Sequence, residues 1–266
     1  MEPEAERIRK TEEKLLQEDP TLAAGRITGG SASSLGQFPW QAGLVIDLIG
    51  INGNGICGGS LVSNNRVITA AHCWYDGQNQ AWRFTVVLGS ILLFTGGERI
   101  ETSNVVMHPN WIPQLILNDV AIIYLPRPVA YSASISPVSL PTPAQSHLTF
   151  AGETAIASGF GMTGSGSGHG ITLDQYLSHV PLQVITNSVC NIWFLGLIQS
   201  SNICTSGTGR VGTCGGDSGG PLVIYENNRP TVIGITSFGI AFGCDIQWPA
   251  AFARVTSFLD FFYSHL

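Results

Sequence analysis

The sequence predicts an all-β protein built as a barrel or a sandwich. Strand-like runs of apolar and β-branched residues recur at short intervals, and glycine, asparagine and proline separate them. The 266 residues include 32 glycines and 14 prolines, which favours many turns. Apolar residues make up 44% of the chain and charged residues only 11%, so a well-packed globular protein is expected.

The strand-like runs fall on both sides of one segment rich in proline and serine. This segment, Pro126–Pro143, holds five prolines and four serines, and we expect it to connect two halves of the fold. The glycine-rich stretch Gly161–Gly170 is expected to be a mobile surface loop. The predicted strands, in chain order, are Gln41–Ile46, Gly59–Val62, Arg66–Ala70, Phe84–Leu88, Val120–Leu125, Thr154–Ala157, Val180–Val184, Pro221–Ile224 and Val232–Phe238.

Helices are expected only at the two ends of the chain. Residues 4–19 contain strong helix formers with apolar side chains on roughly one face, and Pro20 should end this helix. The composition changes abruptly after it, so we interpret this segment as an addition to the main core. At the other end, Ser257–Leu266 is predicted to be helical.

The cysteines predict disulfides rather than a metal site. None of the six forms a C-x-x-C pair, and an even number in a glycine-rich β protein indicates three disulfides and an oxidising compartment. Their spacing does not determine which cysteines pair. Because the chain opens Met-Glu-Pro-Glu-Ala-Glu, with no apolar stretch, we expect a secretory signal to have been removed.

The charges argue against two classes of partner. The net charge of −6 gives no basic surface for nucleic acid, and no apolar run is long enough to span a membrane. Both lysines, Lys10 and Lys14, precede Ile27. The seven fixed positive charges after Ile27 are all arginine. Lysine loses its charge near pH ~10.4, whereas arginine stays charged past ~12.5, so this bias indicates an alkaline environment. Avoidance of cleavage by trypsins would disfavour arginine as well, and explains the bias only in part.

Residues 214–221, Cys-Gly-Gly-Asp-Ser-Gly-Gly-Pro, are the main functional signal. Glycines allow a tight turn that exposes the hydroxyl of Ser218 and directs two backbone N–H groups to one point. A nucleophile beside a preformed oxyanion hole is what acyl transfer requires. A glycine-rich surface turn is the alternative for this motif alone.

Two further residues supply the remaining chemistry of acyl transfer. His72 follows an apolar run and precedes Cys73, whose disulfide would fix it in place, as a general base requires. Asp119 lies at the start of the apolar run Val120–Leu125, where a buried charge needs a hydrogen-bonded partner. A histidine N–H is a suitable partner.

Together these motifs resemble the trypsin/chymotrypsin-type serine protease zymogens, and within them the insect digestive chymotrypsins and the brachyurin-like collagenases. Arg26-Ile27-Thr28-Gly29-Gly30 is similar to the family's activation junction. T-A-A-H-C, N-D-V-A-I and G-D-S-G-G-P follow in the family's order of histidine, aspartate and serine. The resemblance covers residues 26–266.

The resemblance implies a fold and a domain division. The expected fold is two packed antiparallel six-stranded β-barrels with a C-terminal helix, plus an N-terminal helical propeptide. Residues 1–26 would be the activation propeptide and residues 27–266 the protease domain. The first barrel would cover about 27–135, and the second barrel with the C-terminal helix about 136–266. The implied disulfides are Cys57–Cys73, Cys190–Cys204 and Cys214–Cys244.

The resemblance also assigns roles to residues, with Ser218 as nucleophile and His72 as general base. Asp119 would orient His72, and the N–H groups of Gly216 and Ser218 would form the oxyanion hole. Cleavage after Arg26 would free the Ile27 amine to pair with Asp217. The base and walls of the substrate pocket would be Gly212, Thr213, Ser237, Phe238, Gly239 and Ala250.

The implied protein is a secreted digestive endopeptidase, monomeric and without a cofactor or metal. The pocket positions carry no charge, so cleavage is expected after Phe, Tyr, Leu or Met. Partners would be protein or peptide substrates, an activating trypsin-like protease and protein inhibitors, in a gut lumen. Family members often carry Trp where this chain has Phe160 and Phe238, and the calcium loop of some relatives is missing from Gly89–Glu101.

Other functions remain open at this point. A broad-specificity brachyurin-like or elastase-like protease is the main alternative, because Asp245 lies close to the pocket in the sequence. A non-catalytic homologue that serves as a binding adaptor would usually have lost Ser218 or His72. An esterase is disfavoured because the chain lacks a G-x-S-x-G elbow.

Overall fold

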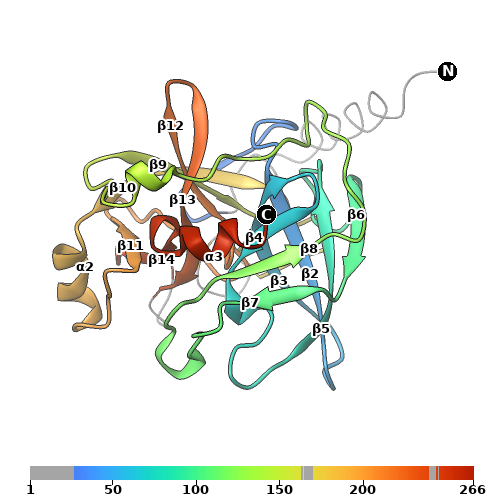
Figure 1. The fold of residues 1–266 in the computed structure, drawn as a ribbon, viewed down its shortest axis with the longest axis horizontal. Helices are drawn as coiled ribbons and strands as arrows, with labels where there is room; N and C mark the ends of the chain where they lie inside the picture. The colour runs from blue at the N-terminus through green and yellow to red at the C-terminus, as the bar shows by residue number, and fades with distance from the viewer. Residues whose placement is uncertain (1–26, 163, 165–169, 240–243, 245) are drawn as a thin grey trace.

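Two antiparallel sheets, each closed into a barrel, lie side by side in the structure (Figure 1). It is a computed structural model that describes residues 27–162, 164, 170–239, 244 and 246–266. The predicted helix over residues 4–19, Arg26 and Asp245 lie outside the described residues, as does most of the stretch 161–170. The predicted architecture of two barrels followed by a C-terminal helix is confirmed.

The first barrel has seven strand segments that act as six strands. Their order is β6-β5-β2-β3-β4-β8-β7. Only two residues separate β6 from β7, and β6 pairs with β5 while β7 pairs with β8, so one bent strand closes the barrel. The bounds are β2 Gln41–Leu48, β3 Asn54–Ser63, β4 Arg66–Thr69, β5 Ala81–Leu88, β6 Glu98–Thr102, β7 Val105–Met107 and β8 Ala121–Tyr124.

The second barrel closes because β9 pairs with both β10 and β12. A seventh strand, β1 (Ser31–Ala32), is added to β10, so the first described residues contact the second barrel. The remaining bounds are β9 Thr154–Gly159, β10 Ser178–Ile185, β11 Asn202–Thr205, β12 Pro221–Glu226, β13 Arg229–Phe238 and β14 Ala250–Arg254.

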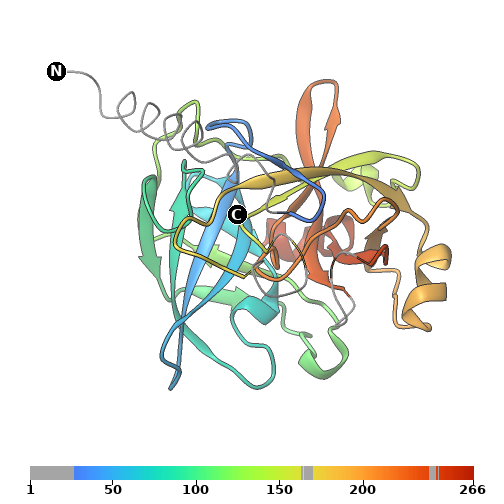
Figure 2. The same ribbon diagram turned by 180° about the vertical axis from the view of Figure 1, so that it is seen from behind.

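Two helical segments accompany the barrels. The predicted tail helix is present as the 3-10 turn Val255–Phe258 followed by α3 (Leu259–Tyr263). The expectation of helices only at the chain ends was wrong, because α2 (Asn187–Phe194) projects from the outer edge of the second barrel (Figures 1 and 2). Its first turn is capped by Thr186, whose Oγ1 accepts a hydrogen bond from the N–H of Val189.

The buried core continues across the contact between the barrels. The hydroxyl of Ser158 on β9 donates to Oε1 of Gln41 on β2 at 2.6 Å, and both groups are buried. The connecting segment Pro126–Pro143 packs along this contact, because Val138 N–H donates to Leu61 and Ser139 pairs with Thr231. The barrels are therefore held in a fixed relation, and residues from both can form one site.

Candidate active site

His72 lies at the end of β4, in the 3-10 turn Ala71–Cys73. The next residue, Cys73, is bonded to Cys57 on the neighbouring strand β3. The turn is therefore held from two sides, by β4 before it and by the disulfide at its last residue. The His72 side chain keeps 24% of its surface exposed, so the ring is anchored but accessible.

Asp119 reaches His72 because β4 and β8 are antiparallel partners. Thr69 pairs with Ala121, so the residues after β4 and before β8 meet at the same edge of the sheet. His72 Nδ1 lies 2.7 Å from Asp119 Oδ2, and the His72 backbone N–H donates to Oδ1 at 2.9 Å. An ionised carboxylate only accepts, so Nδ1 carries the proton and Nε2 is left free as a base.

A third donor to Asp119 comes from the second barrel. The hydroxyl of Ser237, at the end of β13, donates to Asp119 Oδ2 at 2.5 Å. Burial opposes the charged form of His72, but the charge and hydrogen bond of Asp119 outweigh it, and the pKa of His72 is raised. Ser237 was predicted as a pocket wall, and its contact with Asp119 was not predicted.

Ser218 lies directly against the strands that carry His72. Its carbonyl accepts from the N–H of Gly58 on β3 at 2.7 Å and lies 3.6 Å from Cys73 Sγ. The following Gly219 has a φ of 78°, and an added Cβ would lie 2.1 Å from the hydroxyl of Thr69. Only glycine fits this close approach, which brings the predicted serine beside the predicted histidine.

The backbone N–H groups on either side of Asp217 have no acceptor among the described residues. The N–H groups of Asp217, Gly219 and Gly220 all donate to carbonyl oxygens. Within the described part of the chain, those of Gly216 and Ser218 have no acceptor. Gly216 has a φ of 93°, which is the left-handed region that favours glycine. These are the two groups predicted to form the oxyanion hole.

Asp217 is completely buried behind the serine. Its carboxylate accepts from the N–H of Gly161 at 2.8 Å and of Cys214 at 2.9 Å. Burial raises the pKa of Asp217 to about 7, although these two donors act in the opposite direction. Ile27 is also fully buried, and the adjacent Thr28 bridges to Gly212, two residues before Cys214.

The predicted pocket residues come from three segments that the structure brings together. β13 and β14 are paired, with Phe238 opposite Ala251, and Cys214–Cys244 ties the loop before Ser218 to the segment before β14. Gly212 is buried, yet no described atom lies within 4 Å of a Cβ added there. Among the described residues, space is therefore open in front of Gly212. The first segment carries Gly212 and Thr213, the second carries Ser237, Phe238 and Gly239, and the third carries Ala250.

Helix α2 packs against Phe238, one wall of the predicted pocket. Phe194, at its last turn, packs edge-on against Phe238 with ring centroids 5.4 Å apart, and lies 6.5 Å from the ring of Trp248. The disulfide Cys190–Cys204 ties the same helix to β11. Sequence reasoning missed this support because it did not predict the helix.

The site offers no set of metal ligands among the described residues. His72, Cys57 and Cys73 place ligand-type atoms within 4.8 Å of one another, but both sulfurs are bonded in a disulfide. Bonded sulfurs do not act as thiolate ligands. Among the described helices, none has the length and apolar character needed to cross a membrane.

Comparison with known proteins identifies the family. The family model described as Trypsin matches residues 27–262. Serine protease 1 of Drosophila melanogaster is 36% identical over 237 residues, covering 89% of this chain and 84% of that protein. Brachyurin of Leptuca pugilator is 38% identical, and the alignment covers 88% of this chain and 96% of brachyurin. A solved structure described as HL collagenase aligns with a TM-score of 0.80 at 33% identity. The alignment covers 90% of this chain and 97% of that one. The chain therefore belongs to the trypsin family, as a chymotrypsin-like serine endopeptidase.

Proposed function

We propose that this protein hydrolyses peptide bonds through an acyl-enzyme on Ser218. His72 Nε2 takes the proton of the Ser218 hydroxyl as Oγ attacks the substrate carbonyl carbon. The same proton then passes to the leaving amine as the peptide bond breaks. A water molecule then gives a proton to His72 as its oxygen attacks the acyl carbon, and His72 passes this proton to Ser218 Oγ as the bond to the serine breaks and the acid leaves.

Asp119 and Ser237 keep His72 ready for both proton transfers. Asp119 holds the ring through two hydrogen bonds, and Ser237 holds the carboxylate from the second barrel. The imidazolium that forms during attack is stabilised by the buried negative charge. The arrangement depends on both barrels, which explains why the residues are far apart in the sequence.

The two free N–H groups of Gly216 and Ser218 carry the proposal. They would donate to the oxyanion of the tetrahedral intermediate, where negative charge develops. Loss of one such donor typically removes about 2.7–4 kcal/mol of transition-state stabilisation. The N–H of Asp217, which lies between them in the sequence, donates to the carbonyl of Cys214 instead, so the two groups on either side of it remain available to a substrate at this turn.

For specificity, we propose cleavage after Phe, Tyr, Leu or Met. The pocket in front of Gly212 has an aromatic wall in Phe238 and no charged side chain among its described residues. An Arg or Lys side chain would be buried there without a partner. Ala250 narrows the pocket relative to glycine, which favours Leu over Phe. The alternative of broad specificity predicts that Asp245→Ala removes cleavage after Arg.

For activation, we propose that the chain is a zymogen cut after Arg26. The freed amine of Ile27 would pair with Asp217, a buried acid with no basic partner among the described residues. An opposite charge in this position would offset the cost of burying the carboxylate. The activating enzyme would be a trypsin-like protease, because the cut follows an arginine.

The proposed setting is an extracellular digestive fluid, with the gut lumen as the compartment. The three disulfides are stable in an oxidising environment, and a protease domain without lysine keeps its charges at alkaline pH. Protein substrates and protein inhibitors would be the partners.

Labelling with a fluorophosphonate tests the proposal. Protein cut after Arg26 should be labelled on Ser218 and should cleave a peptide library after apolar residues. Ser218→Ala protein serves as the control and should remain unlabelled. A cut, folded protein that is neither labelled nor active would be a binding adaptor. Full activity of uncut Arg26→Gln protein would refute the activation step alone.

A further inference from the structure

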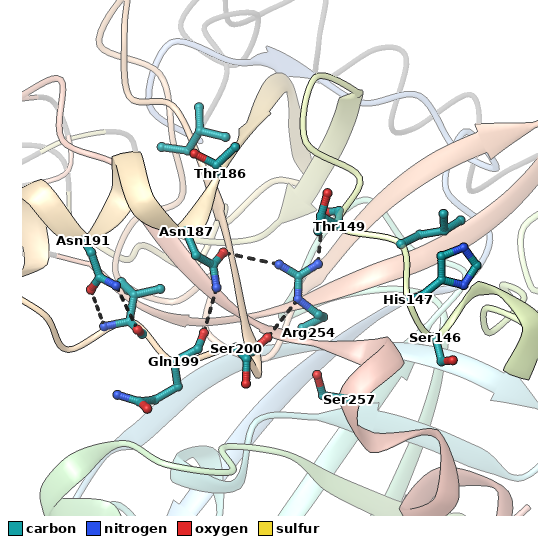
Figure 3. A pocket seen from close by; sticks show the side chains of 13 residues that line it. Ser146, His147, Thr149, Thr186, Asn187, Asn191, Gln199, Ser200, Arg254 and Ser257 are labelled. Carbon is teal, nitrogen blue, oxygen red and sulfur yellow. Dashed lines mark hydrogen bonds between the residues drawn. The ribbon is translucent and has the colours of Figure 1, made fainter.

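A second pocket lies on the second barrel, away from the catalytic residues. Its volume is about 570 Å³, and it shares none of the residues described above for catalysis or substrate binding (Figure 3). It lies where the start of α2, the end of β14 and the loop before β9 meet. Its polar lining includes Ser146, His147, Thr149, Asn187, Ser200 and Arg254.

Arg254 is the notable group in this pocket, because its charge is buried without a counter-charge. Only 7% of the residue is exposed, and no described carboxylate pairs with it. Burial lowers the pKa of the guanidinium, with no acidic group raising it. A buried cation is costly unless an anion or strong acceptors surround it.

The neutral acceptors around Arg254 occupy only part of its hydrogen-bonding capacity. Nε is shared between the carbonyls of Ser200 and Asn202 at 3.1 Å each. Nη1 donates to the carbonyl of Thr149 at 3.0 Å, and Nη2 to Oδ1 of Asn187 at 3.3 Å. Because each terminal nitrogen carries two hydrogens, one N–H on Nη1 and one on Nη2 remain available. Figure 3 shows the guanidinium between these groups, at the centre of the lining residues.

The rest of the lining favours negative charge as well. None of the 13 lining residues is Asp or Glu, although the chain carries a net charge of −6. α2 begins at Asn187, so the positive end of its dipole lies at the pocket. His147 and several hydroxyl groups, including that of Ser257, add donors. A positive pocket on a negative protein would concentrate small anions at this one place.

We propose that this pocket is a binding site for an oxyanion, a carboxylate, sulfate or phosphate group carried by a small molecule. The two free N–H groups of Arg254 match the two oxygens of such a group. The volume exceeds that of a bare ion, so the anionic group would be one end of a larger organic ligand. This site is independent of the catalytic role of Ser218.

Calorimetric titration of Ser218→Ala protein with sulfate, phosphate, acetate and citrate, at constant ionic strength set by chloride, tests the proposal. We expect saturable binding of at least one oxyanion, and the order of affinities distinguishes an organic carboxylate from an inorganic ion. Arg254→Met should reduce the affinity at least tenfold. The matched control is Arg127→Met, which removes an exposed guanidinium paired with Glu98 and should bind normally.

A second variant keeps the test decisive where Arg254→Met does not fold. Asn187→Asp places a carboxylate 3.3 Å from Nη2, where it pairs with Arg254 internally. The variant also loses the hydrogen bonds that Nδ2 donates to the carbonyls of Gln199 and Asn202, so circular dichroism and thermal unfolding check its fold. Oxyanion binding should then fall at least tenfold while the guanidinium is retained. Unchanged binding in Asn187→Asp protein, or no saturable binding by the Ser218→Ala protein, would overturn the proposal.

Discussion

Cleavage after Arg26 is predicted to stabilise the protein, and to do so more strongly as the pH rises. In the described structure the Asp217 carboxyl is buried with two N–H donors and no cation, and burial raises its pKa to about 7. Cleavage would supply the Ile27 ammonium beside it. An opposite charge lowers the pKa of a carboxyl, so the cut protein keeps Asp217 ionised at little cost.

The magnitude follows from the difference between the ordinary pKa of 3.8 and the value of about 7. At ~1.36 kcal/mol per pKa unit, this corresponds to about 4 kcal/mol. Since the folded pKa of an acid is raised, the folded state binds more protons than the unfolded state between these values. The stability of the uncut protein is therefore full below pH ~4 and is lost as the pH rises toward ~7.

Thermal unfolding of cut and uncut protein between pH 4 and pH 8 measures this effect. Ser218→Ala in both forms prevents self-digestion. The gain in Tm on cutting should grow by roughly 8–16 °C over this range for a domain of this size. Asp217→Asn protein is the control, since its gain should lack the part that grows between pH 4 and pH 7, where the carboxyl of Asp217 titrates. A gain that is the same at pH 4 and pH 8 with Asp217 present would refute the reasoning.

Three further predictions concern catalysis and specificity. Ser237→Ala removes a hydrogen bond to a charged group, so kcat should fall roughly 10- to 150-fold with KM little changed, and a larger effect on KM would contradict its role. Phe194→Ala should lower the free energy of unfolding by about 3–5 kcal/mol. It should also raise KM for Phe substrates more than it lowers kcat, and steady-state kinetics on Phe and Leu substrates would measure this. Because the pKa of His72 is raised and its neutral form is required, activity should be lost as the pH falls through a value above ~6.5. The pH at which activity is lost again on the alkaline side should lie well above 8. An optimum of kcat/KM near neutrality would contradict an alkaline setting.

The sequence predicted strands well wherever apolar and β-branched residues dominate. All nine predicted runs coincide with strands, because apolar and β-branched residues favour the half-buried surface of a sheet. Of the strands that it missed, β1, β7 and β11 have only two to four residues, and the other two have another composition. β6 is Glu-Arg-Ile-Glu-Thr, and β14 is rich in alanine and buried along its whole length. Pairing and packing with distant strands, rather than local preference, determine these segments.

Helix α2 was missed for a related reason. Asn187, Ser188 and Val189 are poor helix formers, so no local pattern indicated a helix there. The structure supplies what the sequence lacks through the Thr186 cap, the Cys190–Cys204 disulfide and the buried ring of Phe194. Each of these contacts involves tertiary packing or a cap, which outweighs weak intrinsic preference.

The candidate site shows the same division between local and long-range information. The glycines around Ser218 are a local signal, because the tight turn and the free N–H groups require them at fixed spacing. The contact of Ser237 with Asp119 joins residues 118 positions apart, across the two barrels. Nothing in the surrounding Thr-Ser-Phe-Gly distinguishes a serine that holds a catalytic carboxylate from one that lines a pocket. A local motif can therefore indicate the nucleophile, whereas the group that positions its base becomes visible only when both barrels are in place.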